Sequence, residues 1–168
     1  DGAPNYYASK DFKELEPGTF RIKTRGSRIL KFMGVGDLYV HVARSNGSTI
    51  FKSNLSKNIT YLNNTSYTSP AGSYAATNME EWNIIGCSVK LKEGRIHSAN
   101  ADCVHVNGGT FGPWIENSLF EGYSDDGINM KETKAHILEQ RSPAELVVKQ
   151  TVKKGDVIRI FNPRKGIL

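Results

Sequence analysis

The 168-residue chain has little cysteine, no long apolar run and no extended helical periodicity. Its two cysteines, Cys87 and Cys103, match no zinc-ligand spacing such as paired C-x-x-C knuckles, which argues against a cysteine-rich metal module. We expect two buried thiols, and the sequence leaves a disulfide between them open. No apolar stretch approaches the roughly 18 residues that a membrane span needs. We therefore predict no membrane partner and about one globular domain.

Basic residues exceed acidic ones only near the end of the chain. Up to Met130 there are 13 Lys and Arg against 13 Asp and Glu, whereas residues 131–168 hold nine bases and four acids. These bases alternate with Val, Ile and Phe, a pattern that favours the solvated face of β-strands. An anionic glycan or an acidic neighbour is the second interpretation. No nucleic-acid partner is predicted, because no base-reading or stacking module accompanies the charge.

Short apolar or alternating runs bounded by Gly, Asn, Asp and Ser recur throughout, which is typical of an all-β protein. Near the start, a turn of helix is predicted at 11–15, closed by Pro17-Gly18. Strands are predicted at Thr19–Lys23, Ile29–Met33 and Leu38–Ala43. From Lys57 onward the texture changes to many Asn, Ser and Gly residues between short apolar runs, and we place a boundary there.

A repeat runs through the middle of the chain. Segments 58–64, 82–87 and 113–118 share an apolar core followed by a small residue or Asn. The equivalent positions Asn64, Cys87 and Ser118 are 23 and 31 residues apart, so the longer interval holds an extra loop, placed around 94–100. Asn63 and Asn117 are predicted to occupy one stacked turn position.

A second repeat aligns segment 102–106 with segment 126–130 at a spacing of 24 residues. Alternation predicts that Val104 and Val106 point inward on one coil, with Ile128 and Met130 above them on the next. A parallel β-helix builds its core by stacking like residues coil on coil. We therefore predict β-helix coils over residues 57–131.

Two Gly-Asp turns flank these coils. Val35–Val42 resembles Lys154–Phe161, each a Gly-Asp turn leading into an alternating strand. We interpret them as small β-barrel-like or hairpin insertions in an N-terminal segment, 1–56, and a C-terminal segment, 132–168. Because a β-helix needs several coils and a capped end, we expect a fragment of a longer protein or a chain that completes itself by self-association.

The candidate chemistry lies in Ser98–Asp102 and Ser124–Gly127. Aligning the second repeat puts Asp126 one rung above Asp102, about 4.8 Å away, with Asp125 beside them. Like charges so close cannot all ionise freely, which suits a general acid beside a carboxylate that activates water. Asp also favours turns for structural reasons alone, but stacked acids with His105 and Asn129 at matching places favour the catalytic interpretation.

The surroundings of these aspartates resemble glycoside hydrolase family 110, whose members are right-handed parallel β-helix exo-enzymes that remove α-1,3-linked galactose with inversion. The resemblance is strongest over about 56–131, and its motifs are Gly94–His105, Gly112–Asn117, Phe120–Gly122 and Asp125–Asn129.

The resemblance implies a right-handed β-helix with Asp102, Asp125 and Asp126 as the active-site aspartates and His105 as a site histidine. Two positions depart from the pattern: Cys103 replaces the usual Gly, and Met130-Lys131 replaces Val-His.

Further substrate contacts are predicted around this centre. Arg95 lies on the loop before Asp102, where it could contact a sugar hydroxyl or simply be solvated. Lys131 could neutralise the acidic patch or bind an anionic substrate. The predicted substrate-binding residues are His105, Asn129, Arg95, Asn100 and Lys131; no cofactor and no metal are expected.

Two alternatives remain open at this point. Asn100-Ala101-Asp102 with Asp125-Asp126 is also similar to polygalacturonases, which predicts a hydrolase or lyase of an acidic polysaccharide. A non-catalytic carbohydrate-binding β-helix is the other alternative, with Trp114 and Tyr123 as stacking residues, although a Trp in such a position is often core. All these interpretations share an oligosaccharide or polysaccharide partner and a secreted, periplasmic or cell-surface location.

Overall fold

The computed structural model describes residues 12–23, 31–38, 40, 48–132, 135–149, 152, 154–158, 160–162 and 164–166. All regular elements in these ranges are strands, so the described residues include no helix that could cross a membrane. The chain divides into two units, 1–41 and 42–168. The predicted boundaries at 56 and 131 stay a prediction, whereas the all-β class is confirmed.

The first unit holds an antiparallel hairpin of β1 (Phe12–Glu16) and β2 (Thr19–Ile22). The predicted helical turn at 11–15 is therefore wrong. Pro17 and Gly18, with a φ of 79° at Gly18, form a two-residue turn that pairs the flanking residues as strands. The rings of Phe12 and Phe20 stack across the pair at 4.8 Å.

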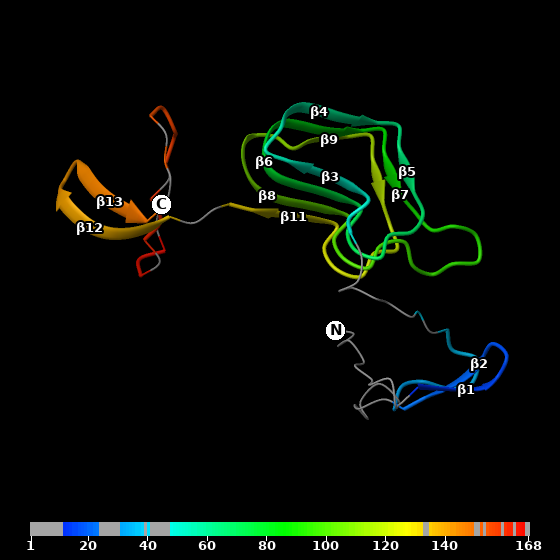
Figure 1. Ribbon diagram of the computed structural model, residues 1–168. Coiled ribbons are helices and arrows are strands. Elements are labelled where there is room, and N and C mark those ends of the chain that lie inside the picture. Colours follow the sequence, from blue (N-terminus) through cyan, green and yellow to red (C-terminus); the bar gives the residue numbers. More distant parts are fainter. Residues whose placement is uncertain are drawn as a thin grey trace. The chain divides into compact units, whose positions relative to one another are not determined.

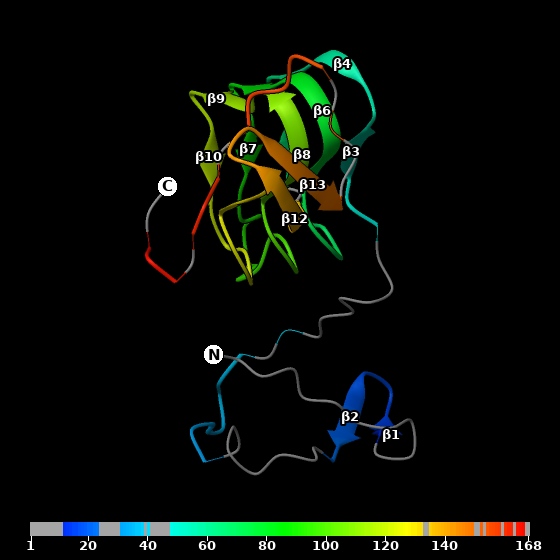
Figure 2. The same cartoon turned by 90° about the vertical axis from the view of Figure 1, so that its left-hand side faces the viewer.

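The second unit contains parallel coils with three strand-bearing faces (Figures 1 and 2). Each coil visits the faces in the same order, and strands on one face pair in parallel with the next coil. The first coil contains β3 (Phe51–Asn54), β4 (Lys57–Leu62) and β5 (Thr65–Ser66), and the second contains β6 (Tyr74–Ile85), which bends across two faces, and β7 (Ser88–Val89). The third coil contains β8 (Val104–Phe111), β9 (Trp114–Glu116) and β10 (Leu119–Phe120). The fourth coil contains β11 (Ile128–Lys131).

The register between coils matches the sequence repeats. Tyr61 pairs with Ile84, and Ile84 pairs with Ile115, at offsets of 23 and 31 residues. Val104 pairs with Ile128 at an offset of 24. The long interval holds most of its extra residues between Val89 and the bridge at Ala99, in the loop predicted there, and the last one in the bulge between Gly109 and Phe111. The predicted β-helix coils are thus confirmed in their register.

Residues with a positive φ stack in three ladders, two beside the β3–β4 corner and one at the β4–β5 corner. The chain turns there with a left-handed backbone, which Gly and Asn adopt most readily. Asn63 and Asn117 share one corner with Gly86 between them, which confirms the predicted stacked turn. The ladders are Leu55, Asn78 and Gly108; Asn58, Glu81 and Gly112; and Asn63, Gly86 and Asn117.

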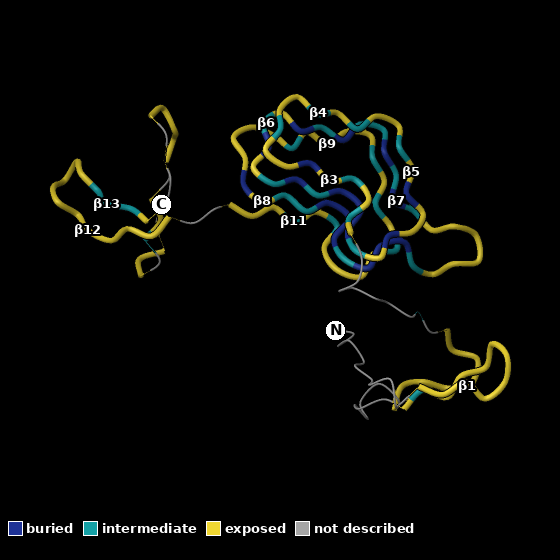
Figure 3. The backbone as a smooth tube through the Cα atoms, in the orientation of Figure 1, coloured by how far each residue is buried: buried dark blue, intermediate teal, exposed yellow. Residues whose placement is uncertain are grey.

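The core lies inside the coils (Figure 3). Its aromatic part stacks Phe51 on Tyr74 at 4.8 Å, with Trp82 edge-on to Tyr61 at 6.0 Å. Its fully buried members are Tyr74, Trp82, Ile84, Cys87, Val89, Ala99, Cys103 and Val104, with Ala76 and Met79 almost as enclosed.

The prediction that Val104, Val106, Ile128 and Met130 all point into the core is only half right. Val104 is fully buried and Val106 partly so, but Ile128 is 46% exposed and Met130 64%. All four share one face through the β8–β11 register. Ile128 and Met130 are uncovered because β11 is the edge strand among the described residues, with a neighbour on one side only.

A second antiparallel hairpin follows the coils, formed by β12 (His136–Ser142) and β13 (Glu145–Lys149). This hairpin precedes the Gly-Asp turn at 155–156 on which the prediction of a C-terminal hairpin rests. The strands predicted after the two Gly-Asp turns are not formed at Leu38, Val157 or Ile158, and Ile29–Met33 is not a strand at residues 31–33. The remaining residues of those strands lie partly outside the described ranges.

Gly109 tests how closely the coils pack. Its φ is 148°, and a Cβ there would lie 2.7 Å from the carbonyl oxygen of Met79 on the neighbouring coil. Gly109→Ala should lower the free energy of unfolding by about 1–3 kcal/mol more than a control without this contact. Gly94→Ala is that control, because Gly94 has a φ of 74° and nothing within 4 Å. Urea denaturation that shows equal losses would contradict the close packing.

Candidate active site

The three aspartates lie at the start of two neighbouring strands. Asp102 and Asp126 each precede their strand, β8 and β11, by two residues. The β8–β11 register places Asp126 one rung from Asp102. The backbone N–H of Cys103 donates to the Asp126 carbonyl at 3.0 Å, and the Asp126 N–H lies 3.4 Å from Asp102 Oδ1. The predicted stacking of the two acids is therefore confirmed.

All three carboxyl groups converge. One oxygen each of Asp102, Asp125 and Asp126 lie within 4.8 Å of one another. Asp102 is 6% exposed, whereas Asp125 and Asp126 are exposed. The cluster thus has a buried inner side at Asp102 and an exposed outer side from which a ligand can approach.

Each stacked aspartate is held by the side chain three residues later. His105 Nδ1 lies 2.5 Å from Asp102 Oδ2, and Asn129 Nδ2 donates to Asp126 Oδ2 at 2.6 Å. His105 pairs with Asn129 in the β8–β11 register. Since alternate strand residues face outward, both side chains turn back toward the acids from the outer face of the sheet. The structure brings these two predicted site residues to the cluster.

The extra loop contributes a contact that sequence reasoning did not use. His97 Nε2 hydrogen-bonds Ser124 Oγ, next to Asp125, across 27 residues of chain. The Ser124 N–H donates to the Ala99 carbonyl at 3.0 Å, so the turn bearing Asp125 is anchored to the coil below. Burial lowers the pKa of His97 below its ordinary value, which favours a neutral ring here. No local sequence pattern signals a pairing at this separation.

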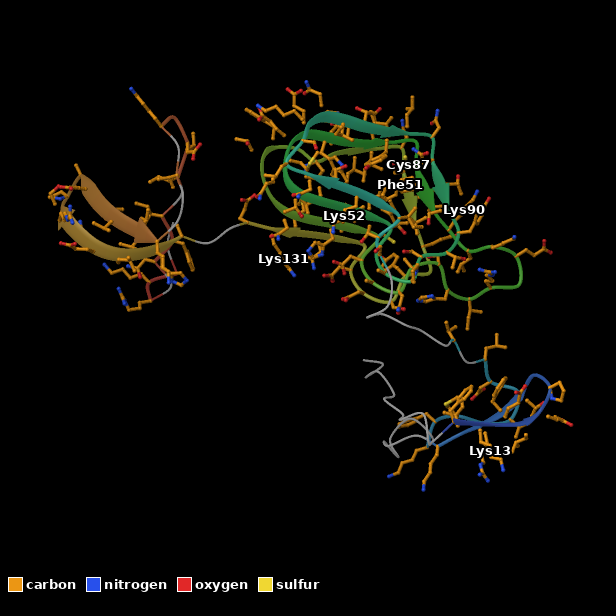
Figure 4. The ribbon with its side chains drawn as sticks, viewed as in Figure 1. Lys13, Phe51, Lys52, Cys87, Lys90 and Lys131 are labelled. Atoms are coloured by element: carbon orange, nitrogen blue, oxygen red, sulfur yellow. The ribbon has the colours of Figure 1, made fainter. Side chains whose placement is uncertain are left out.

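Three predicted substrate-binding residues have other surroundings. Arg95 donates from Nη1 to Thr68 Oγ1 at 2.5 Å. Asn100 is 3% exposed, and its amide donates to the Pro70 carbonyl at 3.0 Å, which ties two coils together. Lys131 projects from the far end of β11 (Figure 4), five residues after Asp126. At about 3.3 Å per residue that is about 16 Å along the strand.

Three clustered carboxylates are also ligands that a hard divalent cation accepts. Among the described residues, Asp102, Asp125 and Asp126 form the one such group. Asp102 and Asp126 already accept hydrogen bonds from the side chains of His105 and Asn129. The geometry alone therefore assigns no metal.

Cys103 lies directly beneath the acids. It is fully buried, and burial, followed by the nearby Asp102 charge, raises the pKa of its thiol to about 12. Cys87 is also buried, and both cysteines are free, as predicted. Below this raised pKa the Cys103 side chain is a neutral thiol.

The reactivity of these thiols tests whether the interior beneath the acidic cluster is closed to solvent. Because the thiolate is the reactive form, the folded protein at pH 8 should react with a disulfide exchange reagent at least about a hundredfold more slowly than in denaturant. Absorbance of the released thiolate measures this rate. Fast labelling of the folded protein at Cys103, located by peptide mapping, would contradict the burial.

Comparison with known proteins supports a relation to glycosidases. The chain is 32% identical over 82 residues to alpha-1,3-galactosidase B of Akkermansia muciniphila, a match that covers 49% of this chain and 10% of that protein. The chain therefore spans only about a tenth of the length of this curated relative. No protein-family model matches the chain, and no solved structure matches it. The chain is distantly related, over part of its length, to an α-1,3-galactosidase.

Proposed function

We propose that the chain carries the acid–base site of a glycosidase that removes terminal α-linked galactose. The observation that carries the proposal is the convergence of Asp102, Asp125 and Asp126 within 4.8 Å, on adjacent coils and open to solvent on one side. Hydrolysis of a glycosidic bond needs one carboxyl that donates a proton to the leaving oxygen and one carboxylate that activates water. The partial similarity to an α-1,3-galactosidase supports the sugar.

The three carboxyl groups differ in what they can reach. Both oxygens of Asp102 have partners, His105 Nδ1 and the Asp126 N–H, and the residue is nearly buried. Asp125 and Asp126 are exposed, so they are the groups that a sugar entering from solvent meets first. In the proposal Asp102 holds the reacting water from below, and the acid and base roles are shared within the cluster.

The spacing suits a single bound water. A water that donates to two oxygens at about 2.8 Å each can bridge a separation of up to 4.8 Å with a near-tetrahedral angle at the water. His105 and Asn129 lie beside this position and offer a ring nitrogen and an amide to sugar hydroxyls. Arg95, Asn100 and Lys131 are left out of the proposed contacts because of their other surroundings.

Single changes of the acids test the proposal. Asp102→Asn, Asp125→Asn and Asp126→Asn keep the shape but remove the proton chemistry, so each should lower kcat on nitrophenyl α-galactoside or α-1,3-galactobiose by about a hundredfold or more. Glu93→Gln, on the exposed extra loop, is the matched control and should keep full turnover. Because the proposal assigns no metal to the site, EDTA should leave the rate unchanged.

Near-normal hydrolysis by all three Asn variants would overturn the site. Turnover of polygalacturonate in place of the galactosides would instead support the acidic-polysaccharide alternative. Turnover of neither, with retained binding, would support a carbohydrate-binding module.

The stereochemical course is a separate part of the proposal, and we propose inversion. Inverting pairs of carboxyls are usually about 6.5–9.5 Å apart, and the cluster oxygens here are closer, so none of the three side chains is splayed outward. A water shared by two carboxylates can still attack the sugar from the face opposite the leaving group. Proton NMR of the first product should therefore show β-galactose from an α-galactoside. The α-anomer as first product would refute inversion.

A further inference from the structure

A second surface of the coils, at the corner between β8 and β9, carries two exposed aromatic rings. Phe111, at the end of β8, is 63% exposed, and Trp114, at the start of β9, is 62% exposed. We call the hollow that they share the aromatic platform; it is lined by Glu81, Asn83, Phe111, Gly112, Pro113 and Trp114. Large exposed apolar side chains gathered in one place mark interaction sites more often than scattered ones do.

The indole of Trp114 is held in place by its surroundings. Trp114 Nε1 donates to Glu116 Oε2 at 2.9 Å, which fixes the orientation of the indole. The Gly112 backbone between the rings lies against Trp82, since a Cβ at Gly112 would be 3.1 Å from the Trp82 carbonyl oxygen. Asn83 pairs with Trp114 in the β6–β9 register. Binding of a ligand that stacks on an indole already held in this way costs little side-chain entropy at Trp114.

The platform is separate from the acidic cluster. The chain runs from Asp102 along β8 to Gly108, where the β8–β9 corner begins, a path of about 20 Å at about 3.3 Å per residue. Figure 1 shows this corner and the loop over 121–127 at opposite ends of β8. A ligand on the platform therefore does not touch the aspartates.

We propose that the aromatic platform binds a neutral hexopyranose unit of a galactose-containing glycan. Such a sugar has one face of C–H groups, which can cover an aromatic face, and a rim of hydroxyls. At the edge of the hollow, the Asn83 amide and the Glu81 carboxylate offer donors and acceptors to these hydroxyls.

Charge selects the class of sugar. Glu81 is the charged residue among the six that line the hollow, and the Glu116 carboxylate accepts the hydrogen bond of the Trp114 indole N–H. Two carboxylates repel a uronic acid or a sulfated sugar and leave a neutral one unaffected. The inference takes from the proposed function only the identity of the sugar; binding at the platform requires no turnover.

The two tryptophans of the chain make this binding measurable. Trp82 is 1% exposed and Trp114 is 62% exposed, so acrylamide quenching reports mainly on Trp114. The Asp126→Asn variant, titrated with α-1,3-galactobiose, should show saturable protection of its fluorescence without hydrolysis of the probe. Phe111→Ala in the same background keeps the Trp114 reporter and should raise the galactobiose concentration at half-saturation about fivefold or more. Tyr67→Ala, an exposed aromatic outside the platform, is the matched control and should bind normally.

The charge argument has its own variant. Digalacturonate should not protect Trp114, and Glu81→Lys should allow it to do so. The proposal is overturned if galactobiose gives no saturable protection, if Phe111→Ala protects as well as its parent, or if digalacturonate protects the parent equally. Failure of the catalytic site appears separately, as absent turnover in the unaltered protein with protection retained.

Discussion

The parallel register between successive coils is the constraint on which the site depends. One backbone ladder sets β11 against β8, and it therefore sets Asp126 against Asp102 and Asn129 against His105. A one-residue shift of β8 in the register with its neighbouring strands would turn Val104 outward and His105 inward, because side chains alternate along a strand. The register is secured by the buried face, where Tyr74 and Val104 stack in the interior.

Bringing three carboxylates together is electrostatically unfavourable, and the structure compensates for it locally. Asp102 has His105 and a backbone N–H as partners, and Asp126 has Asn129. The two exposed acids face water, where their repulsion is reduced. Clustered acids of this kind, here contributed by two neighbouring coils, are common at functional sites.

The coils present two surfaces of different chemistry. At the start of β8 and β11 lies an acidic, hydrogen-bonded cluster, and at the β8–β9 corner lies a pair of exposed rings. A β-helix allows this separation because its coils share a stacked core while their corners can carry loops of variable length. The extra loop over 90–98 and the one-residue bulge between Gly109 and Phe111 are insertions of this kind, and the core strands keep their pairing around them.

The repeats alone determined the β-helix coils, the offsets of 23, 31 and 24 residues and the stacking of Asp102 under Asp126, because a coil-on-coil core requires like residues at equal spacing. Alternation could not show that Ile128 and Met130 are uncovered, since burial depends on a neighbouring strand that lies elsewhere in the chain. The helical turn predicted at 11–15 is replaced by strand β1, because the Pro17-Gly18 turn pairs these residues with β2. The roles of Asn100 and His97 were decided only by tertiary structure, because their partners, Pro70 and Ser124, lie about 30 residues away and no local pattern encodes a contact over that distance.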